Sequence, residues 1–208
     1  MKKDKDKILD LIEENLFKNG FRNVSIDSIA SSIKVSKKTI YKKFCSKEEL
    51  ITAIINRITE CISNDLEKIV KEKIHPVEKI VEISRLMNII GEKFSEKTIE
   101  EVRIHYPNIW KRIEEFRKEM FDKNISKIFY EGIEKGFIID IPPQIIFLIH
   151  QSAIQSIINT EFILHNNYSL ENVFQFTNRL LLNGLLTDKG RKKLKEISKK
   201  RNLEIKIS

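Results

Sequence analysis

Apolar residues recur at three- and four-residue steps along almost the whole of this 208-residue chain. One run, from Leu50 through Ile58 and Leu66 to Val70, keeps that spacing without a glycine or a proline. Such spacing places apolar side chains on one face of an α-helix, whereas a half-buried strand needs strict alternation. Only six glycines and four prolines occur, fewer than the turns of an all-β or α/β protein need. The sequence therefore predicts an all-α fold.

Three short helices are predicted at the N-terminus. Residues 8–17 carry the first helical repeat, and Gly20 stands where a left-handed cap would end it. Ser25 and Ser36 are candidates to cap two further helices, because a serine hydroxyl accepts hydrogen bonds from the free amides of a first turn. The apolar positions around the turn between those two helices are Ile26, Ile29, Ala30, Ile33, Val35, Ile40 and Phe44. This pattern is typical of a helix-turn-helix.

A long fourth helix is predicted to connect two domains. Ser46 and Glu49 have the spacing of a capping box, and the helical repeat that follows continues to Pro76. A helix of about 25 residues is too long to belong to a small N-terminal domain alone. We therefore expect a helix-turn-helix domain at residues 1–48 and a larger helical domain at residues 49–208. Further helices are predicted at residues 76–94, 95–106, 108–134, 143–165, 169–186 and 188–208.

The positive charge is concentrated at the two ends of the chain. The formal net charge is +4 for residues 1–50, −3 for residues 51–188 and +7 for residues 189–208. If the chain contacts phosphates, the N-terminal segment is the first candidate and the basic tail the second. The alternative is that the lysines simply solvate helix surfaces.

Several classes of protein are disfavoured by what the sequence lacks. Cys45 and Cys61 lie in a pattern that cannot form an intrahelical disulfide, which favours a reducing compartment. No apolar stretch approaches the length of a membrane span, and the N-terminus alternates charges, so we expect a cytoplasmic protein. The four histidines are scattered, and neither a phosphate loop nor a nucleophile elbow occurs, so we expect no enzyme activity, no cofactor and no metal site.

The predicted third helix has an unpaired basic outer face. Lys37, Lys38, Thr39, Lys42 and Lys43 point outward, with Tyr41 at the flank. A helix of this size fits the major groove with its first residues toward the base edges. Lys37 and Lys38 are therefore the best candidates for base contacts, with Thr39, Tyr41 and Lys43 nearer phosphates. Ser25 and Lys47 lie at helix N-termini, which attract anions. The alternative is a three-helix core with solvated lysines.

Residues 17–21, 24–30 and 35–50 together resemble the N-terminal domain of the TetR/AcrR (tetracycline-repressor) family. The resemblance covers less than a quarter of the chain. It implies an all-helical homodimer that represses transcription from a palindromic operator and is released by a small-molecule ligand. The family's usual DNA-contacting positions fall on Ser25, Ser36, Lys37, Lys38, Thr39, Tyr41, Lys42, Lys43 and Lys47. Three residues depart from the family pattern: Lys34 replaces a common turn glycine, Lys38 a small residue and Lys43 a histidine.

The resemblance also implies that residues 1–48 are a helix-turn-helix DNA-binding domain and residues 49–208 a helical regulatory and dimerisation domain. The last two core helices, at residues 143–165 and 169–186, would form the dimer interface, with a monomer built around a buried helix as the alternative. An apolar or amphipathic ligand would be lined by Met87, Phe94, Tyr106, Trp110, Phe116 and His150. Aromatic residues at helical spacing are also ordinary core. Competing functions are a helical enzyme, an interaction or adaptor protein, and a regulator that does not repress and has no inducer.

Overall fold

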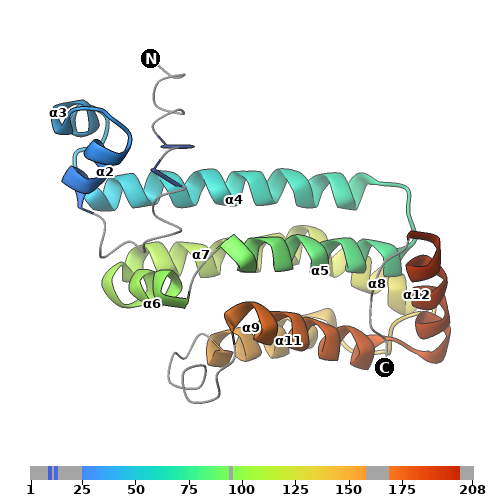
Figure 1. The fold of residues 1–208 in the computed structure, drawn as a ribbon. Helices are drawn as coiled ribbons and strands as arrows, with labels where there is room; N and C mark the ends of the chain where they lie inside the picture. The colour runs from blue at the N-terminus through green and yellow to red at the C-terminus, as the bar shows by residue number, and fades with distance from the viewer. Residues whose placement is uncertain (1–8, 11, 14–24, 94–95, 158–168, 202–208) are drawn as a thin grey trace. The chain divides into compact units, whose positions relative to one another are not determined.

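The computed structural model describes residues 9–10, 12–13, 25–93, 96–157 and 169–201, and these residues are largely helical (Figure 1). The predicted all-α fold is confirmed for this part of the chain. Among the described residues, no helix is long and apolar enough to span a bilayer. The helices are α2 (Ile26–Ser32), α3 (Lys37–Tyr41), α4 (Lys47–Lys71), α5 (Pro76–Lys93), α6 (Glu96–His105), α7 (Pro107–Met120), α8 (Ser126–Glu134), α9 (Pro143–Ile157), α11 (Leu170–Leu185) and α12 (Asp188–Arg201).

Most of the predicted helices occur where the sequence placed them. The long connector is α4, with 25 residues, and α5 begins at Pro76 as expected. The predicted helix at residues 108–134 is instead two α-helices, α7 and α8, joined by the π-helical segment η1 (Phe121–Ile125). The predicted first helix is helical at residues 9–10 and 12–13, and the rest of it, with Gly20, lies outside the described residues. Residues 158–165 of the predicted dimer helix also lie outside them.

The chain divides into two compact units. The first unit comprises residues 1–61 and 93–116, and the second comprises residues 62–92 and 117–208. The first unit therefore contains the start of α4 and all of α6 in addition to α2 and α3. The functional boundary between residues 48 and 49 stays a prediction.

The first unit has its own hydrophobic core. Its fully buried side chains come from the N-terminal helices and from the start of α4, and α6 and α7 add Val102 and Ile109. The buried members are Leu9, Ile12, Ile26, Ile29, Ala30, Ile40, Phe44, Leu50, Ile51, Ile54, Ile55, Val102 and Ile109. Because α2 and α3 are short, this packing is what holds them, since helices of so few residues are not stable alone.

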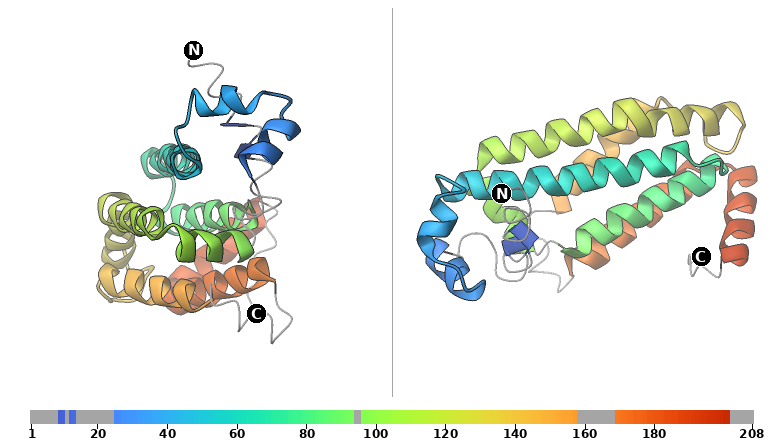
Figure 2. Two further views of the ribbon diagram at one scale, coloured as in Figure 1. Left: turned by 90° about the vertical axis from the view of Figure 1, so that its left-hand side faces the viewer. Right: turned by 90° about the horizontal axis from the view of Figure 1, so that it is seen from above.

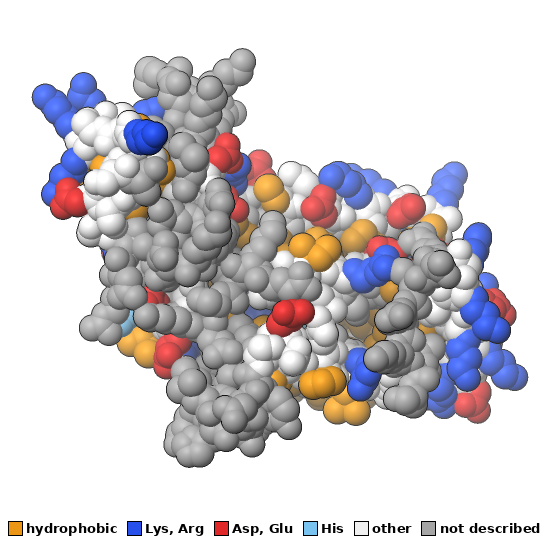
Figure 3. All heavy atoms as spheres, viewed as in Figure 1, with side chains coloured by type: hydrophobic (Ala, Val, Ile, Leu, Met, Phe, Trp, Pro, Cys, Tyr) orange, Lys and Arg blue, Asp and Glu red, His pale blue; other side chains and the backbone are white. Residues whose placement is uncertain are grey.

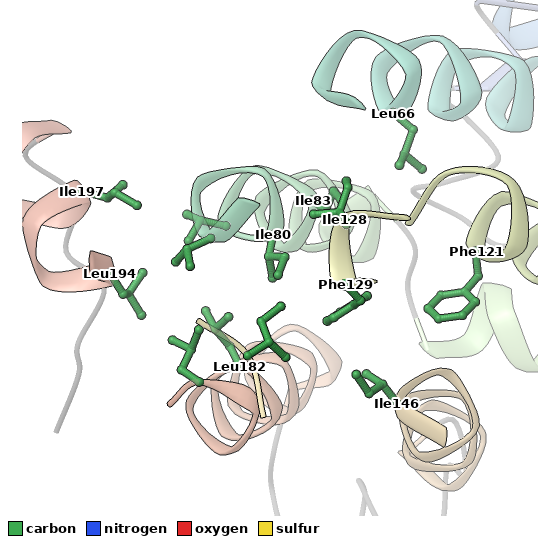
Figure 4. Close-up of a cluster of buried hydrophobic side chains, with 14 residues drawn as sticks. Leu66, Ile80, Ile83, Phe121, Ile128, Phe129, Ile146, Leu182, Leu194 and Ile197 are labelled. Atoms are coloured by element: carbon green, nitrogen blue, oxygen red, sulfur yellow. The ribbon is translucent and has the colours of Figure 1, made fainter. Parts of the chain in front are cut away.

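The second unit packs a separate core (Figure 4). Leu66, Ile80, Phe129, Leu182 and Leu194 come from five different helices and point into one cluster. Within this unit α9 and α11 run side by side (Figures 1 and 2). The aromatic ring of Phe121, in the π-helical segment, stacks on Phe147 of α9 with ring centroids 4.6 Å apart. The π segment thus turns a large side chain into the core between α8 and α9.

The start of α12 is fixed by a close backbone approach. Thr187 accepts a hydrogen bond through Oγ1 from the backbone amide of Gly190 at 3.1 Å and so caps the first turn of this helix. A Cβ atom at Gly190 would lie 2.1 Å from the carbonyl oxygen of Phe137. Only glycine therefore allows α12 to begin at this position.

Candidate nucleic-acid interface

The helix-turn-helix segment (residues 25–44) begins each of its helices with a serine cap. The Oγ of Ser25 accepts a hydrogen bond from the amide of Ser28 at 3.0 Å, and the Oγ of Ser36 accepts one from the amide of Thr39 at 3.0 Å. The Ser36 hydroxyl also lies 2.7 Å from the hydroxyl of Thr39. Both predicted caps are confirmed, and they set the directions in which α2 and α3 start.

Two apolar residues orient α3 in the first unit. Ile40 is fully buried and Phe44 is 1% exposed, so one side of the helix is fixed against the core. The opposite side faces solvent, where the side chain of Tyr41 is 45% exposed. Tyr41 is therefore not packed inside, and its hydroxyl can reach a ligand outside the protein.

Three lysines extend from this segment without an acidic partner among the described residues. Lys38 and Lys42 are exposed, and Lys43 is half-buried. Figure 3 shows lysine and arginine side chains standing out from the α2–α3 region. These ammonium groups remain available to an anion, and their long stems let them reach it.

Lys37 differs from the other lysines, and here the expectation of an unpaired basic face is wrong. Its Nζ lies 2.9 Å from both carboxylate oxygens of Asp27 on α2. The hydrogen bond and the negative charge of Asp27 raise the pKa of the Lys37 ammonium. The ammonium group of Lys37, the first residue of α3, is thus paired with a carboxylate.

The start of α4 borders the same segment. The Oγ of Ser46 accepts from the amide of Glu49 at 3.0 Å, while the carboxylate of Glu49 accepts from the amide of Cys45 at 2.7 Å. The capping box is therefore present, although Glu49 reaches one residue further back than the simple pattern predicts. Lys47 is half-buried, and burial lowers the pKa of its ammonium, partly offset by Glu101. Its side chain is less exposed than those of Lys38 and Lys42.

The six predicted ligand-lining residues do not share one described cluster. Tyr106 and Trp110 pack against the core of the first unit, and Met87 packs against the core of the second. Phe116 is half-buried in α7, and Phe94 lies outside the described residues. The Nε2 of His150 lies 3.2 Å from Oδ1 of Asn178, whose own amide donates to Oδ1 of Asn88 at 2.8 Å. Burial lowers the pKa of His150 and favours a neutral ring.

Asp27 is the functional candidate that sequence reasoning missed. From the sequence pattern, Asp27 is expected only to stabilise the positive N-terminal end of the α2 dipole. Its contact with Lys37 spans ten residues and a turn, so a helical i, i+4 rule does not find it. The only sequence signal is an acid and a base that each stand in the first turn of two adjacent short helices.

The helix-turn-helix geometry of this segment agrees with its similarity to a known protein family. Residues 8–54 match the family model described as bacterial regulatory proteins, tetR family. This N-terminal part of the chain is therefore of the TetR type. The match covers the helix-turn-helix segment and the start of α4, so the resemblance found in the sequence is confirmed. None of the curated proteins matches the chain.

Solved structures extend the likeness beyond this segment, to the fold of most of the chain. A protein from Saccharomonospora viridis in complex with choline has a TM-score of 0.72 at 15% identity, covering 90% of this chain and 100% of that one. FadR from Bacillus subtilis in complex with stearoyl-CoA has a TM-score of 0.64 at 21% identity, covering 86% and 97%. SmeT, the repressor of a Stenotrophomonas maltophilia multidrug efflux pump, has a TM-score of 0.64 at 15% identity, covering 88% and 91%. The chain therefore has the fold of a TetR-family transcriptional regulator.

Proposed function

We propose that this cytoplasmic protein is a transcriptional repressor that binds a palindromic operator as a homodimer and leaves it when a small molecule binds. The observation that carries the proposal is the two-sided character of α3. Ile40 and Phe44 fix one side of the segment in the core, while Lys38, Tyr41 and Lys42 face solvent. A short helix mounted in this way fits the major groove of duplex DNA, whose width admits an α-helix.

The proposed DNA contacts are of two kinds, to base edges and to phosphates. Lys37 and Lys38 stand at the start of α3, the part of a recognition helix that meets base edges. Lys42, Lys43 and Tyr41 lie further along and would bond phosphates. Ser25, Ser36, Thr39 and Lys47 complete the proposed contact set, at or near helix N-termini whose amides attract anions.

A double variant that removes two lysine charges from the helix-turn-helix segment tests the DNA contact. A footprint on the DNA that flanks the protein's own gene supplies the operator duplex, since regulators of this kind often act on neighbouring genes. We expect the Lys38→Gln/Lys42→Gln protein to bind it less tightly, and the slope of log K against log salt to fall by about 0.9 for each phosphate that the variant no longer neutralises. Fluorescence anisotropy between 50 and 200 mM KCl, roughly the range over which such contacts weaken, measures both.

The matched control removes two lysine charges elsewhere. Lys118 and Lys127 are exposed and belong to the second unit, so Lys118→Gln/Lys127→Gln should keep the affinity and the salt slope of the natural protein. If the slope falls equally in both double variants, the effect is general electrostatics and α3 is not the DNA-binding element.

The homodimer is supported by an apolar face on the α9–α11 pair. Ile145, Leu148 and Ile149 are exposed on α9 at i, i+3 and i+4, and Phe176 and Leu180 are exposed on α11 at i and i+4. Figure 3 shows hydrophobic side chains over this part of the molecule. Gly184 continues the α11 series, and the space beside it is open. A second copy would cover this face, since a two-fold interface uses the same patch on both subunits.

Leu180, the most exposed of these side chains at 75%, offers the sharpest test of that interface. Glutamate at this position would bury a charge in the dimer, so we expect Leu180→Glu to cost about 3 kcal/mol or more of association free energy and to yield monomers. Light scattering after gel filtration should give a dimer for the natural protein. Ile89, 52% exposed on α5, supplies the control, because Ile89→Glu should leave the dimer intact. A dimeric Leu180→Glu protein would contradict this interface.

The ligand-release step is supported by the kind of proteins that share the fold. Two of the similar structures are complexes with choline and with stearoyl-CoA, and a third is the repressor of an efflux pump. We infer an apolar or amphipathic small molecule for this chain, with Met87, Phe94, Tyr106, Trp110, Phe116 and His150 as the proposed lining.

A further inference from the structure

The two helices of the helix-turn-helix segment are joined by an ion pair on their solvent side. The Nζ of Lys37, the first residue of α3, contacts both carboxylate oxygens of Asp27 in the first turn of α2 at 2.9 Å. Both side chains are more than half exposed, at 51% for Lys37 and 65% for Asp27. The pair is therefore open to a ligand that approaches α3 from outside.

A carboxylate at this position works against indiscriminate DNA binding. Asp27 neutralises Lys37 and would be repelled by phosphates, whereas Lys38 and Lys42 have no acidic partner among the described residues and attract any duplex. Exposed ion pairs hold their partners weakly, because water and salt compete for both charges. The pair can thus exchange its internal contact for contacts with a base pair that suits both members.

We propose that Asp27 is a specificity-determining residue that, together with Lys37, selects a G·C base pair in each half of the operator. The inference rests on the proposed function as a DNA-binding regulator. Lysine only donates hydrogen bonds and aspartate only accepts them. The major-groove edge of G·C presents two adjacent acceptors, guanine N7 and O6, beside one donor, the N4 amino group of cytosine.

The other base pair matches this ion pair less well. In A·T the adenine amino group stands between two acceptors, N7 and the thymine O4, so a lysine meets no adjacent pair of acceptors and a carboxylate lies beside an acceptor. Lys37 donating to guanine while Asp27 accepts from cytosine keeps both charges hydrogen-bonded. The positive and negative groups of the protein then read the two bases of one pair.

Selection of binding sites from a pool of random-sequence duplexes tests the proposal. We expect the natural protein to enrich a motif with one G·C pair per half-site that is preferred about tenfold over A·T, in line with a good base contact. Asp27→Asn should shift that position toward A·T, since an asparagine amide bonds adenine N6 and N7. It should also free Lys37 for phosphate, so that the dimer's affinity for random duplex rises and its salt slope steepens by roughly 1.8.

Two further variants serve as a charge control and as a second test of the ion pair. Glu60→Gln removes the same charge from an exposed position of α4, about 20 Å along the helix from its start, and should leave the motif unchanged. Lys37→Gln should lose the guanine preference at the same position, which tests the pair if Asp27→Asn fails to fold. A motif and salt slope that are the same for Asp27→Asn, Lys37→Gln and Glu60→Gln would overturn the inference and leave DNA binding standing. A natural protein that enriches no motif at all would overturn the proposed function as well.

Discussion

The helices α2 and α8 end in the same backbone turn but place different residues at its left-handed position. After α8 this residue is Gly136, with φ of 70°, and the amide of Phe137 closes the turn on the carbonyl of Gly132 at 2.8 Å. After α2 it is Lys34, with φ of 55°, and the amide of Val35 closes the turn on the carbonyl of Ala30 at 2.9 Å. A residue with a Cβ atom costs about 1–2 kcal/mol in this region, and glycine avoids the cost.

The difference shows that packing and capping, rather than the residue at the left-handed position, define these turns. In both, the residue that follows lies against a core: Val35 packs on the core of the first unit and Phe137 on that of the second. Beyond α2, Ser36 immediately caps α3. The helix-turn-helix turn is therefore held by its neighbours on both sides, and it carries conformational strain that the turn after α8 does not.

The larger change in the free energy of unfolding is expected at the unstrained turn after α8. A Cβ atom at Gly136 would meet nothing within 4 Å, so Gly136→Ala changes the backbone preference and little else. We expect the free energy of unfolding to fall by about 1–2 kcal/mol. Urea denaturation followed by circular dichroism, at one protein concentration for both proteins, measures it.

Gly136→Asn is the control for that experiment. Asparagine tolerates the left-handed region better than alanine, so its loss should be the smaller of the two. Equal stability of all three proteins would mean that this turn relaxes freely, and the comparison with Lys34 would then carry no information about strain.

Sequence patterns predicted one of these turns and not the other. The helical repeat that predicts a helix at residues 108–134 stops just before Gly136, and a glycine just past the end of a helix commonly takes the left-handed conformation. At residue 34 nothing in the composition predicts a left-handed residue, and only the resemblance to the TetR family pointed to a position where glycine is common. The π-helical segment at Phe121–Ile125 was also missed, because one extra residue in a turn shifts an apolar stripe by less than the stripe's own width.

In the candidate site, too, the sequence predicted some features and missed others. The exposure of Tyr41 and the burial of Ile40 follow from spacing within one short helix, and both were predicted. The pairing of Lys37 with Asp27 was not, because it depends on the angle at which α2 and α3 cross, which a pattern along one helix does not contain. Local periodicity thus predicts which face of a helix is exposed to solvent. Which of the exposed charged side chains form ion pairs depends on the tertiary structure.

The smaller change in the free energy of unfolding is expected at the strained turn after α2. Lys34→Gly should remove the left-handed cost, but the added freedom of glycine in the unfolded chain offsets part of the gain. We therefore expect the free energy of unfolding to rise by about 0.5–1 kcal/mol, measured by the same urea titration. Lys34→Ala separates strain from charge, because it removes the ammonium and keeps the Cβ atom. If alanine stabilises the protein as much as glycine does, repulsion among the lysines of this segment is the cause. If only glycine does, the natural sequence retains a strained lysine between α2 and α3, and stability alone does not account for that residue.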